Sequence, residues 1–124
     1  MRRVVIDPEA FLDWFSPGGR GLRAEYEEGA LAVHVPRIFA THVLEVAARE
    51  RKRSPERLVR LADEVERVGF VVSDVQADLL AAWLARGLTA LQAPYAALAQ
   101  SLGIPLVAGN ADLRRHAGPA IQRS

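Results

Sequence analysis

Short apolar runs alternate with amphipathic segments along this chain, a pattern that predicts strands alternating with helices. The β-branched run Val4-Val5-Ile6 shows no polar alternation, which is typical of a strand buried on both faces. Similar runs predict strands over 31–35, 70–72 and 104–107. Apolar residues at helical spacing predict helices over 9–16, 37–53, 55–68, 74–86 and 90–102, and a further helix follows Asn110. This order predicts an α/β fold: a three-layer α/β/α sandwich with a mostly parallel central sheet. Without a linker or repeat, residues 1–124 are expected to form a single domain.

Several residues mark where helices begin and break. Asp7 is a helix-capping residue, and Pro8 suits the first helical position that follows it. Asn110 is expected to cap the last helix in the same way. Capping boxes are predicted for Ser73 with Gln76 and for Thr89 with Gln92. The segment 17–21 (PGGRG) is expected to break the first helix and to form the only flexible stretch.

Polar residues follow two of the predicted strands directly. Asp7 comes after the first strand, and the segment 108–112 comes after the last. In open parallel sheets, ligands bind beyond the carboxyl ends of the strands. We therefore expect any functional site at this edge of the sheet.

Composition narrows the chemistry available to such a site. The chain holds 16 Lys and Arg against 15 Asp and Glu, a formal net charge of +1, and no cysteine. Thiol catalysis and thiolate zinc sites are thereby excluded, and a strongly basic nucleic-acid-binding coat is not expected. The apolar runs are too short to span a membrane, and the apolar segment near Met1 is too short for a signal peptide, so a cytoplasmic location is expected.

The order of the segments resembles that of a known family. Val4-Val5-Ile6-Asp7, the helix over 36–47 that carries Glu45, the segment 88–95 (LTALQAPY) and the segment 96–107 together resemble a PIN domain. The resemblance covers essentially the whole chain. It implies a metal-dependent nuclease that acts on RNA, of the VapC toxin type, with a cognate antitoxin protein as partner and a possible homodimer.

The resemblance also implies a set of site residues. The family clusters acids at four positions around Mg²⁺ or Mn²⁺, hard ions that prefer oxygen ligands. Asp7 and Glu45 match the first two positions, whereas Gln92 stands at the third and Asn110 at the fourth. Asp112 matches an acid that often follows the fourth. The implied catalytic residues are Asp7, Glu45 and Asn110, and the implied metal ligands are Asp7, Glu45, Gln92, Asn110 and Asp112.

The same positions also depart from the family or have simpler interpretations. Glu9 stands where the family has a small hydroxyl or amide residue, and Ala108 stands where a threonine is usual. Glu45 could form only an ion pair with Arg49 one helical turn on. His42 lies three residues before Glu45, but two ligands do not make a zinc site. The basic run at 49–53 is more simply explained as a solvated helix end than as an RNA-backbone contact.

These residues and the resemblance are consistent with three functions. The first is a Mg²⁺- or Mn²⁺-dependent endoribonuclease of a toxin–antitoxin system. The second is a degenerate PIN-like domain, catalytically weak or inactive, that acts through protein or RNA binding. The third and least favoured is a helix-turn-helix DNA binder, suggested by residues 97–105, because an apolar run follows them where a polar recognition helix is required.

Overall fold

A four-stranded parallel sheet organises the fold. The computed structural model describes residues 1–117, so the final part of the expected domain, residues 118–124, lies outside the described residues. The strands are β1 (Arg2–Ile6), β2 (Leu31–Pro36), β3 (Val71–Ser73) and β4 (Leu106–Val107), in the order β3-β2-β1-β4. The helices are α1 (Pro8–Asp13), α2 (Arg20–Glu27), α3 (Phe39–Arg49), α4 (Pro55–Arg67), α5 (Ala77–Ala85), α6 (Ala93–Leu102) and α7 (Ala111–Ala117), and a 3₁₀ turn, η1, spans Pro17–Gly19.

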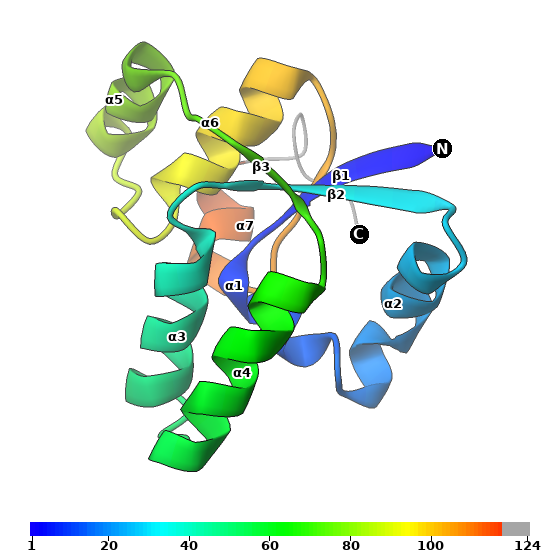
Figure 1. Ribbon diagram of the computed structural model, residues 1–124. Helices are drawn as coiled ribbons and strands as arrows, with labels where there is room; N and C mark the ends of the chain where they lie inside the picture. The colour runs from blue at the N-terminus through cyan, green and yellow to red at the C-terminus, as the bar shows by residue number, and fades with distance from the viewer. Residues whose placement is uncertain (118–124) are drawn as a thin grey trace.

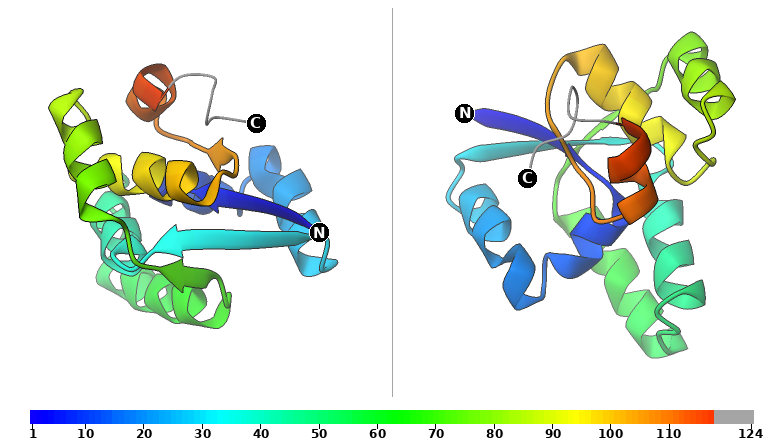
Figure 2. Two further views of the ribbon diagram at one scale, coloured as in Figure 1. Left: turned by 90° about the horizontal axis from the view of Figure 1, so that it is seen from above. Right: turned by 180° about the vertical axis from the view of Figure 1, so that it is seen from behind.

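Helices cover both faces of this sheet, as the sequence predicts. Seen from above, α5, α6 and α7 lie on one side of β1 and β2, and α3 and α4 lie on the other (Figure 2). The central strand β1 pairs with β2 from Arg2 to Val5 and with β4 at Val5 and Ile6. Because every pair is parallel, the carboxyl ends of β1, β2 and β4 meet at one edge, from which α1, α3 and α7 continue (Figure 1). This arrangement confirms the predicted three-layer α/β/α fold.

An aromatic cluster fixes α1 against the rest of the core. The Phe11 ring lies edge-on to Phe39 at 5.5 Å and to Phe70 at 5.7 Å between ring centroids. Trp14, also buried, packs on Tyr26 and Phe70. Edge-on pairs of this kind add about 0.5–1.5 kcal/mol each beyond the burial of their area. Since α1 begins directly after Asp7, this packing also fixes the backbone at the carboxyl end of β1.

The structure corrects several sequence predictions. The segment 17–21 follows the end of the first helix, as predicted, but it is regular rather than irregular: a 3₁₀ turn leads directly into helix α2, whose Leu22 and Tyr26 pack against the core. Helix α3 ends at Arg49 rather than continuing to 53. Helix α5 begins at Ala77 and Gln76 forms no side-chain cap, so the capping box predicted with Ser73 is wrong.

The backbone that follows α6 tests the helix-turn-helix interpretation. Residues 97–105 belong to α6 and the turn after it, and β4 follows, so the helix-turn-helix interpretation is wrong. Among the described residues, no helix has both the length and the apolar character needed to cross a membrane.

Candidate functional site

Buried polar side chains gather at the carboxyl edge of the sheet. The buried polar or charged residues of the described chain are Asp7, His42 and Gln92, with exposed fractions of 1%, 7% and 8%. Asp7 ends β1, His42 lies on α3, and Gln92 precedes α6. Burying such groups is costly unless they are hydrogen-bonded. Their partners therefore show what this edge is built to hold.

The Asp7 carboxylate accepts three backbone hydrogen bonds. Its Oδ1 accepts from the Ala10 N–H at 2.8 Å and from the Gly109 N–H at 2.8 Å, and its Oδ2 accepts from the Asn110 N–H at 3.0 Å. The first bond is the predicted cap of α1, and the other two tie the segment between β4 and α7 to the end of β1. Burial raises the pKa of Asp7 above its ordinary value of 3.8, and the three N–H donors partly oppose that shift. Asp7 therefore joins the start of α1 to the segment at Gly109 and Asn110, which lies more than 100 positions away in sequence.

The two amides at the implied acidic positions are bonded to each other. Gln92 donates from Nε2 to Oδ1 of Asn110 at 3.2 Å, and its Oε1 accepts from the Thr89 N–H at 2.9 Å. The same Asn110 oxygen also accepts from the Leu113 N–H at 2.8 Å, which confirms the predicted cap of α7. The Thr89–Gln92 bond is half of the predicted capping box, although the helix begins only at Ala93. Gln92 and Asn110 thus join the starts of α6 and α7.

A histidine–tyrosine pair lies beneath this edge, and sequence reasoning missed it. The Nδ1 atom of His42 and the Tyr95 hydroxyl lie 2.9 Å apart, and Tyr95 is fully buried. Burial, followed by the nearby charge of Asp7, raises the pKa of Tyr95 well above its ordinary value of 10.0. Burial lowers the pKa of His42, and the charge of Glu45 opposes that shift. The sequence shows His42 three residues before Glu45, but no pattern in it indicates that His42 bonds to Tyr95.

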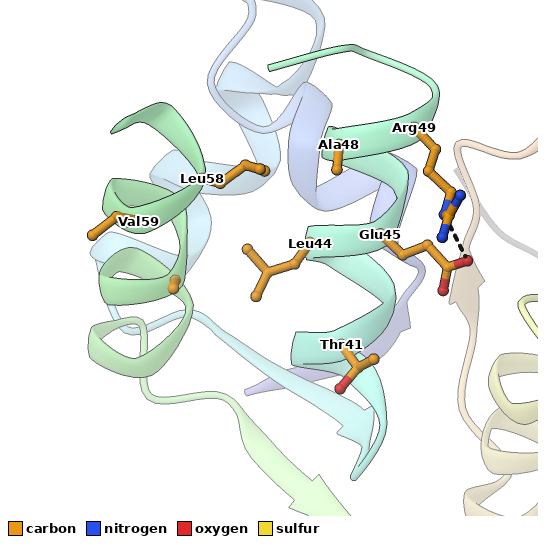
Figure 3. Close-up of a pocket in the computed structure, with 8 residues that line it drawn as sticks. Thr41, Leu44, Glu45, Ala48, Arg49, Leu58 and Val59 are labelled. Carbon is orange, nitrogen blue, oxygen red and sulfur yellow. Dashed lines mark ion pairs between the residues drawn. The ribbon is translucent and has the colours of Figure 1, made fainter. Parts of the chain in front are cut away.

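Glu45 is paired with an arginine, and its charge acts on His42 of the buried set. It forms the expected ion pair with Arg49, with 3.4 Å between Oε1 and Nε, and 44% of its side chain is exposed. Figure 3 shows Glu45 and Arg49 on the side of α3 away from Leu58 and Val59 of α4. Between the two helices lies a groove with mostly apolar walls. Its lining residues are Thr41, Leu44, Glu45, Ala48, Arg49, Leu58, Val59 and Ala62.

Two more carboxylates lie near the edge, in different surroundings. Burial, and then the charge of Asp7, raises the pKa of Glu9 above its ordinary value of 4.5, so Glu9 lies close to Asp7. Asp112, in the first turn of α7, forms an ion pair with Arg115 on the surface. The structure therefore brings Asp7, Gln92 and Asn110 together by direct hydrogen bonds, with Glu9 beside them, and it pairs Glu45 and Asp112 with arginines.

Gly109 allows this close packing. A Cβ atom at this position would lie 2.7 Å from the Ala10 nitrogen and 2.9 Å from the carbonyl carbon of Glu9. Only a residue without a side chain lets the segment after β4 approach α1 closely enough to donate to Asp7. The sequence shows this glycine after a predicted strand, but not the backbone that it faces.

The donor set does not fit the cation that the PIN resemblance implies. A divalent ion of this kind is held through oxygen ligands, usually with at least one or two carboxylates free to bind it. Here the amides at two positions that the resemblance implies are acidic bond to each other, and three of about four acceptor sites on the Asp7 carboxylate are taken by N–H donors. Over residues 1–117, no three His, Asp or Glu side chains lie together as metal ligands would. The site as built is a closed hydrogen-bonded cluster.

Known proteins share this architecture. The PIN domain family model matches residues 4–119. A crystal structure of the Mycobacterium tuberculosis toxin VapC20, described as cleaving the sarcin–ricin loop, superposes with a TM-score of 0.68 at 14% sequence identity, covering 97% of this chain and 99% of that one. A search of curated proteins finds no match. The chain has a VapC-like fold and belongs to the PIN domain family.

Proposed function

We propose that this chain is an RNA-binding PIN domain, related to the endoribonucleases of toxin–antitoxin systems, that holds RNA without cleaving it by divalent-metal chemistry. PIN nucleases are generally metal-dependent, and the VapC20 toxin is described as cleaving the sarcin–ricin loop. The observation that carries the proposal is the hydrogen-bonded pair of amides, Gln92 and Asn110, at two positions where the resemblance implies carboxylates.

Charge explains why this exchange favours binding over cleavage. In a carboxylate cluster, a cation must first neutralise the site before a phosphodiester can approach. Two amides remove two negative charges, and the remaining buried carboxylate, Asp7, is surrounded by N–H donors. A phosphate can then approach this edge with less repulsion, while no ion is held to activate water.

Basic side chains beside the edge supply the attraction. Arg49 ends α3, and Arg51, Lys52 and Arg53 follow it. Arg51 bonds to Asp13 of α1 at 2.9 Å. This bond places the run next to the helix that Asp7 caps. Contacts from Lys and Arg to phosphates supply most of the sequence-independent affinity for nucleic acids.

A cleavage assay with restored acids tests the proposal. Wild type, Glu45→Gln and the double variant Gln92→Asp with Asn110→Asp are incubated with RNA in Mn²⁺ or in EDTA, and binding is measured in parallel. We expect wild type to bind RNA equally in both and to leave it intact, and the double variant to bind Mn²⁺. Wild-type cleavage that Glu45→Gln abolishes would instead support the metal-dependent endoribonuclease, with Asp7, Glu45, Gln92, Asn110 and Asp112 as the implied set.

The groove between α3 and α4 favours a second role, as the binding site of an antitoxin-type protein. Its walls include Leu44 and Val59, and Val59 is 71% exposed, so an apolar helix could bury this surface. Val59→Asp should abolish complex formation with a co-expressed VapB-type candidate in size-exclusion chromatography. Arg67→Asp, on the same helix but outside the groove, is the control and should leave the complex intact.

The expected homodimer stays a prediction, and α5 is the surface that supports it. This helix is apolar over most of its length, yet Trp83 is its one buried residue and Leu84 is 44% exposed. Helices that are apolar all round are normally buried. Sedimentation analysis of wild type and Leu84→Glu tests the prediction, since only an α5-mediated dimer would dissociate in the variant.

A further inference from the structure

The loop after α3 holds a lysine in an unusual backbone conformation. Lys52 has φ +50°, and it is the only non-glycine residue with positive φ in the part of the chain that the structure describes. The chain turns back on itself here, with the Arg51 N–H donating to the Val46 carbonyl at 3.2 Å and the Arg53 N–H to the Ala47 carbonyl at 3.0 Å. These bonds fix the left-handed conformation at Lys52 as part of the helix end.

A lysine is a poor choice for this conformation. Glycine adopts positive φ without a steric cost, and asparagine tolerates it, so helices usually end in one of these two residues. Lys52 is also the only lysine in the sequence, which otherwise uses arginine at every basic position. A strained residue that the fold does not require points to a use for its side chain.

Two basic neighbours of Lys52 are engaged in ion pairs. Its neighbours Arg49 and Arg51 form ion pairs with Glu45 and Asp13, respectively. Lys52 is exposed and takes part in none of the ion pairs found within residues 1–117. Its ammonium group is therefore a cation that is open to a ligand from solvent.

The loop also lies beside the candidate site. Arg51, one residue before Lys52, bonds to Asp13 at 2.9 Å, and Asp13 is the last residue of α1, the helix that Asp7 caps. Because α1 is six residues long, this contact lies about 9 Å along the helix from the site at Asp7, a distance that an RNA strand bound at the edge can span. The left-handed conformation directs the chain away from the axis of α3 at this point.

We propose that Lys52 binds a phosphate of the RNA at this edge, and that the left-handed turn presents this cation beside the site. The inference rests on the proposed RNA-binding function and names a residue that carries it. It predicts opposite effects on stability and on binding when Lys52 is replaced by glycine.

The test uses a fluorescein-labelled single-stranded RNA of about 12 nucleotides and fluorescence anisotropy across a salt series. Loss of one phosphate contact lowers the slope of log K against log[salt] by about 0.7, which is about fivefold in affinity at 0.1 M salt. Lys52→Gly should show this loss while its Tm rises by about 4 °C, because glycine accepts the left-handed turn. Lys52→Asn should lose the same affinity, and Lys52→Arg should retain it.

Matched controls make the outcomes decisive. Arg67→Gln removes the same charge from the far end of α4, about 20 Å along the helix, and should leave affinity unchanged. Because Lys52 is the only lysine, its acetylation can be followed by mass spectrometry, and RNA should protect it. If wild type binds RNA but Lys52→Asn binds equally well, the role of Lys52 is refuted and the proposed function stands. If wild type does not bind RNA, the proposed function fails as well.

Discussion

Replacement of Asp7 tests whether its carboxylate stabilises the fold through hydrogen bonds or serves to bind a metal ion. Asp7→Ala removes three hydrogen bonds, from the N–H groups of Ala10, Gly109 and Asn110. Hydrogen bonds to a charged acceptor contribute about 1.5–3 kcal/mol each, but burial disfavours this carboxylate, as its raised pKa shows, so about 1 kcal/mol per bond is the appropriate magnitude. We therefore expect the free energy of unfolding to fall by about 3 kcal/mol, a large part of the 5–15 kcal/mol typical of a domain.

Asp7→Asn sharpens the same prediction. Its side-chain oxygen can keep the bonds from Ala10 and Gly109, but its NH₂ group would face the Asn110 N–H, which leaves that buried donor unpaired. The expected loss is about 1–2 kcal/mol. Urea denaturation in EDTA measures both variants, with Glu45→Ala as a control that should change stability by less than about 0.5 kcal/mol, because its ion pair is exposed.

The opposite sign would refute this reasoning. In a site built to hold a cation, carboxylates repel one another when the ion is removed, so an Asp→Asn change is stabilising in EDTA. If Asp7→Asn is more stable than wild type, then Asp7 is not the hydrogen-bonded tie between α1 and α7 that the structure shows.

Three further predictions follow from the same edge. Gly109→Ala should destabilise the fold by about 2–3 kcal/mol in urea denaturation, because its Cβ would lie 2.7 Å from a backbone nitrogen. The control Gly21→Ala has open space around it and should be neutral or slightly stabilising. Tyr95→Phe should cost about 1–2 kcal/mol, since it leaves Nδ1 of buried His42 without its partner; an unchanged midpoint would contradict this. Because the pKa of Glu9 is raised above 4.5, the folded state holds the Glu9 proton to higher pH than the unfolded state does, and the stability that Glu9 contributes declines as pH rises from about 4.5 through the folded pKa. Glu9→Gln should therefore flatten the profile of stability against pH in this range and add about 0.5 kcal/mol or less at pH 7. An identical profile for the variant and wild type would contradict the assignment.

The sequence predicted the sheet well because its signals are local. The β-branched run at Val4–Ile6 and the runs that gave β2 and β3 are short, continuous and buried or edge-placed. The caps at Asp7 and Asn110 were also predictable, since a capping side chain bonds to a backbone only three residues away. Helix α2 was missed because it begins inside the glycine-rich segment 17–21 and carries only Leu22 and Tyr26 as large apolar residues.

The site itself depends on contacts that the sequence does not encode locally. Asp7 and Gly109 are bonded across 102 positions, and Gln92 and Asn110 across 18. The resemblance to the PIN family placed these residues at one edge, but only the structure shows that the two amides bond to each other. The same holds for His42 and Tyr95, which lie 53 positions apart.

The cleavage assay in Mn²⁺ and EDTA tests the central claim most directly. The account predicts that wild type binds RNA with the same affinity in both conditions and leaves it intact, because the amides of Gln92 and Asn110 replace the charges that a cation needs. Cleavage by wild type that requires Mn²⁺ and is lost in Glu45→Gln would contradict it.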